Sequence, residues 1–153
     1  MALKKKTPAK KKEERKKNAP VVEIVRGEKA PRKPSGKISK AQKFQLDVIA
    51  RTNFNMCNGE MVVELLKKNR RMWRSAYMPL NSISLRDMED DCWHADTLYI
   101  YAKEGWQFHL EELVREQFKA DEIYWIGGSG AVDMLGTSEI KDKTQVILSV
   151  WWD

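Results

Sequence analysis

The stretch TLYIYAKEGWQFHLEELVREQFKADEIYWI, residues 97–126, decides the fold because the spacing of its apolar residues changes twice. Apolar residues alternate with other residues over 97–102, which is typical of a β-strand with two distinct faces. They recur every three or four positions over 107–119, which predicts a helix, and residues 123–126 form a short apolar run that predicts a second strand. The stretch therefore predicts a strand–helix–strand unit.

The expected strands differ in how they are buried. In the first strand, Leu98 and Ile100 point to one face, and Tyr99 and Tyr101 point to the other. Residues 145–152, near the end of the chain, are apolar at both alternating sets of positions. A strand that is buried on both faces usually lies in the middle of a sheet, so we expect this last strand to be central.

Two helices are expected before this unit, over residues 39–51 and 60–77. Ser39 and Gln42 form a capping-box pattern that starts the first helix, and Pro79 ends the second. The residues expected to point inward are Phe44, Val48 and Ile49 in the first helix, and Val62, Leu65, Leu66, Met72 and Trp73 in the second.

These elements predict an α+β or α/β fold with two N-terminal helices and a small mixed sheet of three or four strands. The strand–helix–strand spacing favours a right-handed crossover between parallel strands. One segment has two interpretations, because the glycine-rich residues 127–130 suit either a hairpin turn or a loop into a short helix. We favour a helix over 131–135, since Ala, Met and Leu prefer helices and Gly136 suits the helix end.

Charge divides the chain into two parts. The formal net charge is +6, but residues 1–40 carry 15 Lys and Arg against 4 Glu, a net charge of +11. Residues 41–153 carry 13 Lys and Arg against 18 Asp and Glu, a net charge of −5. We therefore predict a disordered, Lys- and Pro-rich arm over residues 1–37 and a single acidic domain over residues 38–153.

The composition of the arm favours contact with phosphates. Lysine outnumbers arginine and residues 1–40 contain no aromatic residue, which indicates binding to a nucleic-acid backbone without sequence preference. A tail that serves only solubility or localisation is the alternative. The candidate phosphate ligands of the arm are Lys4, Lys5, Lys6, Lys10, Lys11, Lys12, Arg15, Lys16 and Lys17.

A second basic group lies inside the expected helix over residues 60–77. Lys67, Arg70, Arg71 and Arg74 are spaced at i, i+3, i+4 and i+7, so they would form one stripe on that helix. We interpret this stripe as a second phosphate-binding surface, with a solvated helix face as the alternative.

Few residues suggest catalysis or metal binding. Asp91, His94 and Asp96 lie close together in the sequence DDCWHAD, residues 90–96, and carboxylates beside an imidazole are typical of sites for divalent metals. The plainer interpretation is an acidic loop, because the spacing matches no metal-site pattern. The two cysteines likewise match neither a disulfide framework nor a zinc site, so we expect no metal and no cofactor.

The six tryptophans exceed what a small core usually needs, and indoles are favoured in protein interfaces. We expect some of them to anchor a protein partner. The candidates are Trp93, Trp106, Trp151 and Trp152.

Together these features predict a non-enzymatic protein that associates non-specifically with DNA or RNA inside the cell, in the cytoplasm, nucleus or nucleoid. The first alternative is an interaction or assembly module, such as a viral factor or particle subunit, whose acidic domain binds a protein. The second is a small metal-dependent hydrolase or nuclease. No apolar run approaches the ~20 residues that span a membrane, so no membrane partner is expected.

Overall fold

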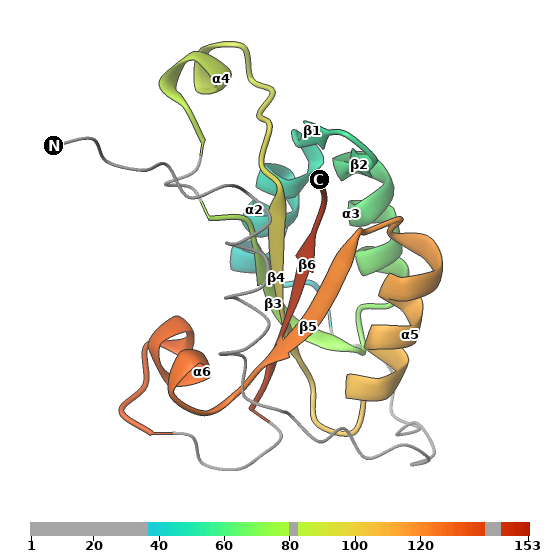
Figure 1. Ribbon diagram of the computed structural model, residues 1–153, viewed down its shortest axis with the longest axis vertical. Coiled ribbons are helices and arrows are strands. Elements are labelled where there is room, and N and C mark those ends of the chain that lie inside the picture. Colours follow the sequence, from blue (N-terminus) through green and yellow to red (C-terminus); the bar gives the residue numbers. More distant parts are fainter. Residues whose placement is uncertain (1–36, 80–82, 140–144) are drawn as a thin grey trace, which may run out of the picture.

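A four-stranded antiparallel sheet organises the computed structural model, which describes residues 37–79, 83–139 and 145–153 (Figure 1). The order of the strands across the sheet is β3-β4-β6-β5, so the last strand lies between β4 and β5. The strands are β3 (Trp73–Tyr77), β4 (Thr97–Ala102), β5 (Glu122–Ile126) and β6 (Ile147–Trp151).

Five helices are defined among these residues, and they give an α+β fold. They are α2 (Lys40–Ala50), α3 (Gly59–Lys68), α4 (Leu85–Glu89), α5 (Gln107–Gln117) and α6 (Gly128–Leu135). Helices α3 and α5 cover one face of the sheet, whereas α6 lies on the opposite side (Figure 1). A small hairpin of β1 (Asn53–Phe54) and β2 (Cys57–Asn58) joins α2 to α3. None of the described helices is long and apolar enough to cross a membrane.

The core lies between the sheet and helices α3 and α5. Leu98 and Ile100 of β4 are fully buried there, as are Leu148 and Val150 of β6, so the alternation expected for residues 97–102 is confirmed. The C-terminal Trp152 is also fully buried, and its indole Nε1 donates to the carbonyl oxygen just after α5 at 3.1 Å. The end of α5 therefore covers the end of the chain.

The central position of the last strand is confirmed, but the mixed sheet is not. β6 pairs antiparallel with both β4 and β5, and β3 pairs antiparallel with β4. β4 and β5 run in the same direction, as the strand–helix–strand spacing predicts, yet they are not neighbours. The length of the strand–helix–strand unit determines that β5 runs parallel to β4. The crossover leaves one strand position between them, and β6, which is apolar on both faces, occupies it.

The prediction of a helix over residues 60–77 is wrong beyond Lys68, where α3 ends. The next residue, Asn69, ends α3, and its side-chain Nδ2 donates to the carbonyl oxygen of Leu65 at 3.0 Å. After a turn, Trp73–Tyr77 forms an edge strand of the sheet. Apolar residues at helical spacing did not reveal this change, because a short strand gains its stability from pairing with β4 rather than from local preference.

Helix α2 begins as expected, with its capping box in place. The backbone N–H of Gln42 donates to the Ser39 hydroxyl at 3.1 Å, and the Ser39 N–H donates to Oε1 of Gln42 at 3.0 Å. The prediction of which residues of α2 point inward was partly wrong, because Phe44 is 64% exposed. Gln42, Leu46 and Ile49, at i, i+4 and i+7, form the buried stripe instead.

Helix α2 also protects the free edge of β3. The side chain of Gln42 donates through Nε2 to the carbonyl oxygen of Arg74, and Oε1 of Gln45 accepts from the backbone N–H of Ala76 at 3.3 Å. Exposed strand edges present unpaired backbone groups that invite aggregation, and two glutamines one helical turn apart satisfy two such groups here.

The glycine-rich segment opens a helix rather than a hairpin. Helix α6 begins at Gly128, and Gly136 ends it with a left-handed backbone conformation of φ 62°, as the favoured interpretation has it. The helix lies against the end of β5, because a Cβ at Gly130 would come within 3.0 Å of Ile126 Cγ2.

Gly59 allows α2 and α3 to approach closely. A Cβ built on Gly59 would lie 2.0 Å from the carbonyl oxygen of Ile49 and 2.8 Å from that of Thr52, and both of these atoms belong to backbone that cannot easily move. The Gly59 N–H also donates to the Thr52 carbonyl at 2.9 Å.

We therefore expect Gly59→Ala to lower the free energy of unfolding by about 3 kcal/mol or more, because backbone must shift to admit the methyl group. The matched variant Gly130→Ala meets one side-chain methyl, Cγ2 of Ile126, rather than backbone, and it gains helix propensity, so its free energy of unfolding should change by less than about 1 kcal/mol. Urea denaturation measures both values. Equal stability of the two variants would contradict the close contact.

Candidate functional site

Four cations gather where the turn between α3 and β3 meets the turn between β4 and α5. They are Arg70, Arg71, Arg74 and Lys103, and we call this group the basic corner. The first three come from the α3–β3 segment, and Lys103 follows β4. The two segments are joined because the Lys103 N–H donates to the carbonyl oxygen of Met72 at 2.9 Å.

Aromatic rings support the three arginines of the basic corner. The guanidinium carbon lies 5.1 Å from the ring centroid of Trp73 for Arg70, 4.8 Å from that of Trp106 for Arg71, and 5.3 Å from that of Tyr101 for Arg74. Each contact is a cation–π interaction, which orients the flat guanidinium group over a ring. The N–H groups at the edges of the Arg71 and Arg74 guanidinium groups can still donate to an anion.

Arg70 is the most firmly held of these cations. Its Nη1 donates to the carbonyl oxygen of Trp73 at 3.0 Å, and its Nη2 donates to Oε1 of Gln42 at 2.7 Å. Its Nε is buried and has no hydrogen-bond acceptor within the described ranges. The side chain of Arg70 is therefore held in place by α2 and by β3.

The cations of the corner repel one another. Burial lowers the pKa of Lys103, and the positive charges of Arg70 and Arg74 lower it further. Burial also lowers the pKa of Arg70. Among the residues that the structure describes, no carboxylate forms an ion pair with any of the four cations. A bound anion would relieve this repulsion, so the corner is suited to a phosphate group.

The structure corrects the basic helix stripe expected from the sequence. Lys67 lies in the last turn of α3, Arg70 and Arg71 lie in the following turn, and Arg74 lies in β3. Three of the four stay together, but on a turn and a strand. Lys103 was missed because it is 29 positions after Arg74 in the sequence, and only the pairing of β3 with β4 brings the two near each other.

The phosphate ligands expected in the arm lie outside the described residues. They are Lys4, Lys5, Lys6, Lys10, Lys11, Lys12, Arg15, Lys16 and Lys17. The described part of the chain begins at Lys37. Two hydrogen bonds connect its first residues to the basic corner, because Ser39 is bonded to Gln42 and Gln42 is bonded to Arg70.

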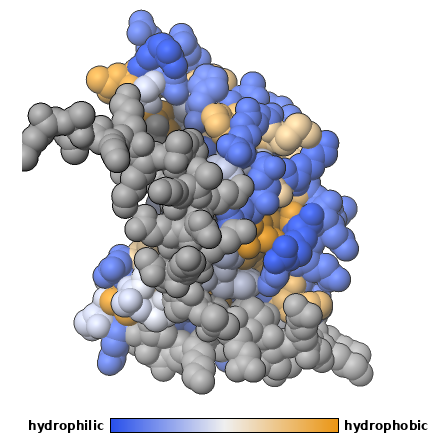
Figure 2. Space-filling view, viewed as in Figure 1, coloured by the Kyte–Doolittle hydropathy of each residue, from blue (hydrophilic) through white to orange (hydrophobic). Residues whose placement is uncertain are grey.

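The candidate catalytic residues lie at the opposite end of the sheet strands, near α4, where Figure 2 shows hydrophilic residues beside a smaller hydrophobic patch. Each of the three side chains engages a different partner. Asp91 Oδ1 accepts from Arg51 Nε at 2.5 Å, His94 Nδ1 lies 3.4 Å from Asp87 Oδ2, and Asp96 Oδ2 accepts from Trp151 Nε1 at 3.2 Å. Within the described ranges, no three His, Cys, Asp or Glu side chains are grouped to hold a metal ion.

The four tryptophans considered as partner anchors lie mostly in the core. Trp93, Trp106 and Trp152 are 8%, 5% and 0% exposed, and only Trp151 is half-buried. The indole Nε1 of Trp93 donates to the carbonyl oxygen of Val48 at 3.0 Å. Buried indoles that are hydrogen-bonded inside the fold stabilise it, and they present little surface to a partner.

Comparison with protein-family models, with curated proteins and with solved structures found no match.

The hydrogen bonds of Asp87 in α4 lead to a prediction about how stability depends on pH. Hydrogen bonds from Ser84, Arg86 and His94 lower the pKa of Asp87 from 3.8 to about 2. Because the folded state favours the carboxylate, its contribution to stability is present above the ordinary pKa and is lost as the pH falls from about 4 towards 2. We expect Asp87→Asn to melt at a lower temperature than the wild type at pH 6, with the difference shrinking between pH 4 and pH 2. A difference in melting temperature that stays constant over this range would contradict the assignment.

Proposed function

We propose that this chain is a non-enzymatic nucleic-acid-associated protein that binds the phosphate backbone through its basic corner and its basic arm. The observation that carries this proposal is the basic corner. It consists of four cations without carboxylate partners in the described part of the chain, and aromatic rings orient its three arginines, with Gln42 also holding Arg70. Arginine suits this role because its planar fork donates two parallel hydrogen bonds to a phosphate.

The position of the corner agrees with phosphate binding. Residues 41–153 carry a net charge of −5, so a concentrated group of cations that pair with no carboxylate among the described residues stands out from its surroundings. The acidic residues around α4 lie near the other end of the β4 strand, where Arg51 already pairs with Asp47 and Asp91. A polyanion would be attracted to the corner and repelled from that end.

The arm adds charge next to the same place. It joins the described part at Lys37, beside the capping box that holds Gln42 and through it Arg70. A flexible arm of this length reaches about 35 Å on average, so its lysines would contact phosphates on either side of those bound at the corner. Lysine-rich segments bind phosphates without reading sequence, and the proposed binding is therefore non-specific.

Two double variants of the full chain test the role of the corner. Arg71→Gln with Arg74→Gln removes two charges from it, and Arg86→Gln with Arg115→Gln removes two charges from arginines that are paired with Asp87 and Glu111. Fluorescence anisotropy with a single-stranded 12-mer measures binding as a function of salt.

We expect the corner variant to bind more weakly and its slope of log K against log salt to become shallower by about 1.4, since each lost phosphate contact removes ~0.7. The control variant has the same net charge and should keep the wild-type slope. If both variants lose affinity equally, overall charge rather than the corner is responsible, and the proposal is wrong.

A second candidate function, a protein-interaction module, is favoured by α4. Leu85 is 85% exposed and Met88 is 47% exposed, next to the acidic side chains of Glu89 and Asp90. An exposed apolar pair with an acidic border suits contact with a basic protein surface.

If α4 mediates self-association, Leu85→Ser with Met88→Ser should convert an assembled species to a monomer in size-exclusion chromatography with light scattering. A wild type that is monomeric at every concentration would exclude the homo-oligomeric form of this second function.

A further inference from the structure

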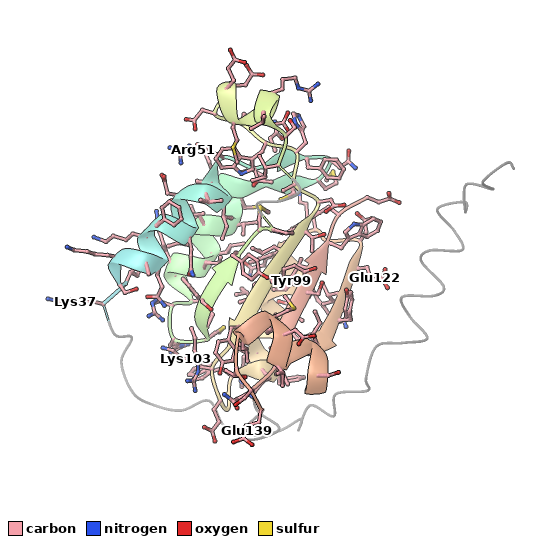
Figure 3. The ribbon with its side chains drawn as sticks, turned by 90° about the vertical axis from the view of Figure 1, so that its left-hand side faces the viewer. Lys37, Arg51, Tyr99, Lys103, Glu122 and Glu139 are labelled. Carbon is pink, nitrogen blue, oxygen red and sulfur yellow. The ribbon has the colours of Figure 1, made fainter. Side chains whose placement is uncertain are left out.

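The face of the sheet that α3 and α5 leave uncovered carries all four tyrosines of the chain. Tyr99 and Tyr101 alternate with the core residues of β4, and Tyr124 alternates with the core residue Trp125 in β5. Tyr77 joins them from β3, because it pairs with Tyr99. Figure 3 looks onto this face, with Tyr99 near its centre and α6 in front of its lower part.

Strand register places three of these tyrosines in one row across the sheet. Tyr77 pairs with Tyr99, Tyr99 pairs with Ser149, and Ser149 pairs with Tyr124. Neighbouring strands are about 4.8 Å apart, so the row extends over about 14 Å. The rings of Tyr77 and Tyr99 lie 5.5 Å apart between centroids, with planes tilted by 42°.

The rings on this face are partly accessible. Tyr77 is 40% exposed, and Tyr99, Tyr101 and Tyr124 are half-buried. The hydroxyl of Tyr101 accepts a hydrogen bond from Nε2 of Gln145 at 3.4 Å. Each of the four tyrosines therefore keeps part of its surface exposed.

Ser149, the fourth member of the row, differs from the tyrosines because its side chain is buried. It sits in the middle of the row and is 1% exposed, yet its hydroxyl has no hydrogen-bond partner within the described ranges. Buried polar atoms are nearly always paired, and an unpaired one in a native structure calls for an explanation. Because Ser149 is covered, the polar edge of a base would reach this hydroxyl only if the neighbouring rings move apart.

The charge around this face changes from basic at one end of the strands to acidic at the other. Arg74 lies over the Tyr101 ring and leads to the basic corner, which includes Lys103. At the other end of the strands, Thr97, Trp151 and Glu122 form a row, and Asp96 accepts a hydrogen bond from Trp151. Phosphates are favoured at the first end and disfavoured at the second, as the separate positions of Lys103 and Glu122 show (Figure 3).

We propose that the part of this tyrosine-bearing face that α6 leaves uncovered binds a single-stranded nucleic acid, with its bases stacked on Tyr77, Tyr99 and Tyr124 and its phosphates at the basic corner. The proposal rests on the proposed function and names its substrate class. Aromatic residues on an open four-stranded sheet stack two or three bases, and such stacking tolerates any base. A duplex does not fit, because its bases are already stacked and paired inside the helix.

The test separates stacking from phosphate contact by using two probes and the full chain. The probes are a fluorescein-labelled 12-mer of deoxythymidine and an abasic 12-mer with the same sugar–phosphate backbone. The variants are Tyr77→Thr with Tyr124→Thr, which removes two rings but keeps good strand formers, and Tyr77→Phe with Tyr124→Phe, which removes only the hydroxyls. Thermal unfolding followed by circular dichroism confirms that both variants fold.

We expect the Thr variant to bind the thymidine 12-mer at least 25-fold more weakly than the wild type, since each lost ring costs about fivefold or more. Its affinity for the abasic 12-mer should not change, and the Phe variant should bind both probes within twofold of the wild type. Wild-type affinity of the Thr variant for the thymidine 12-mer would overturn the proposal, as would a wild type that binds both probes equally.

The same experiment distinguishes phosphate binding at the basic corner from base stacking on the tyrosines. If the abasic 12-mer binds the wild type and the corner variant Arg71→Gln with Arg74→Gln loses that binding, the proposed function holds even when the tyrosine variants have no effect. If the Phe and Thr variants lose affinity equally, the hydroxyls and not the rings make the contact, and base stacking is overturned. If the wild type binds neither probe, both proposals fail.

Discussion

The side chain of Gln42 is the interaction on which the candidate interface depends. Its Oε1 accepts from the Ser39 N–H and from Arg70 Nη2, and its Nε2 donates to the carbonyl oxygen of Arg74. One amide group thus closes the cap of α2, covers the free edge of β3 and fixes an arginine of the basic corner. Because these bonds share one side chain, the placement of the cations is tied to the docking of the helix.

The sheet uses the alternation of its strands for two purposes. One set of side chains, including Leu98 and Leu148, packs under α3 and α5 and supplies the core. The other set carries Tyr99 and Tyr101 to the opposite face, beside Arg74. The same backbone geometry that buries the core therefore presents aromatic rings next to the basic corner.

Much of the fold could be predicted from local patterns, but the site could not. The capping box at Ser39 and the alternation over residues 97–102 are local signals, and both were confirmed. The sheet order and the switch from helix to strand before Trp73 depend on pairing between distant segments, which spacing does not encode. Lys103 and the tyrosine row were missed for the same reason, because strand register alone brings them together.

The most direct test of the account is a map of the nucleic-acid contact at single residues. Amide signals of the ¹⁵N-labelled full chain, followed by NMR during titration with a deoxythymidine 12-mer, provide it. The account predicts the largest shifts in β3, in β4 around Tyr99 and in the turns that carry Arg71 and Lys103, with little change in the β1–β2 hairpin. Shifts confined to α4 or to residues outside the sheet and the basic corner would contradict it.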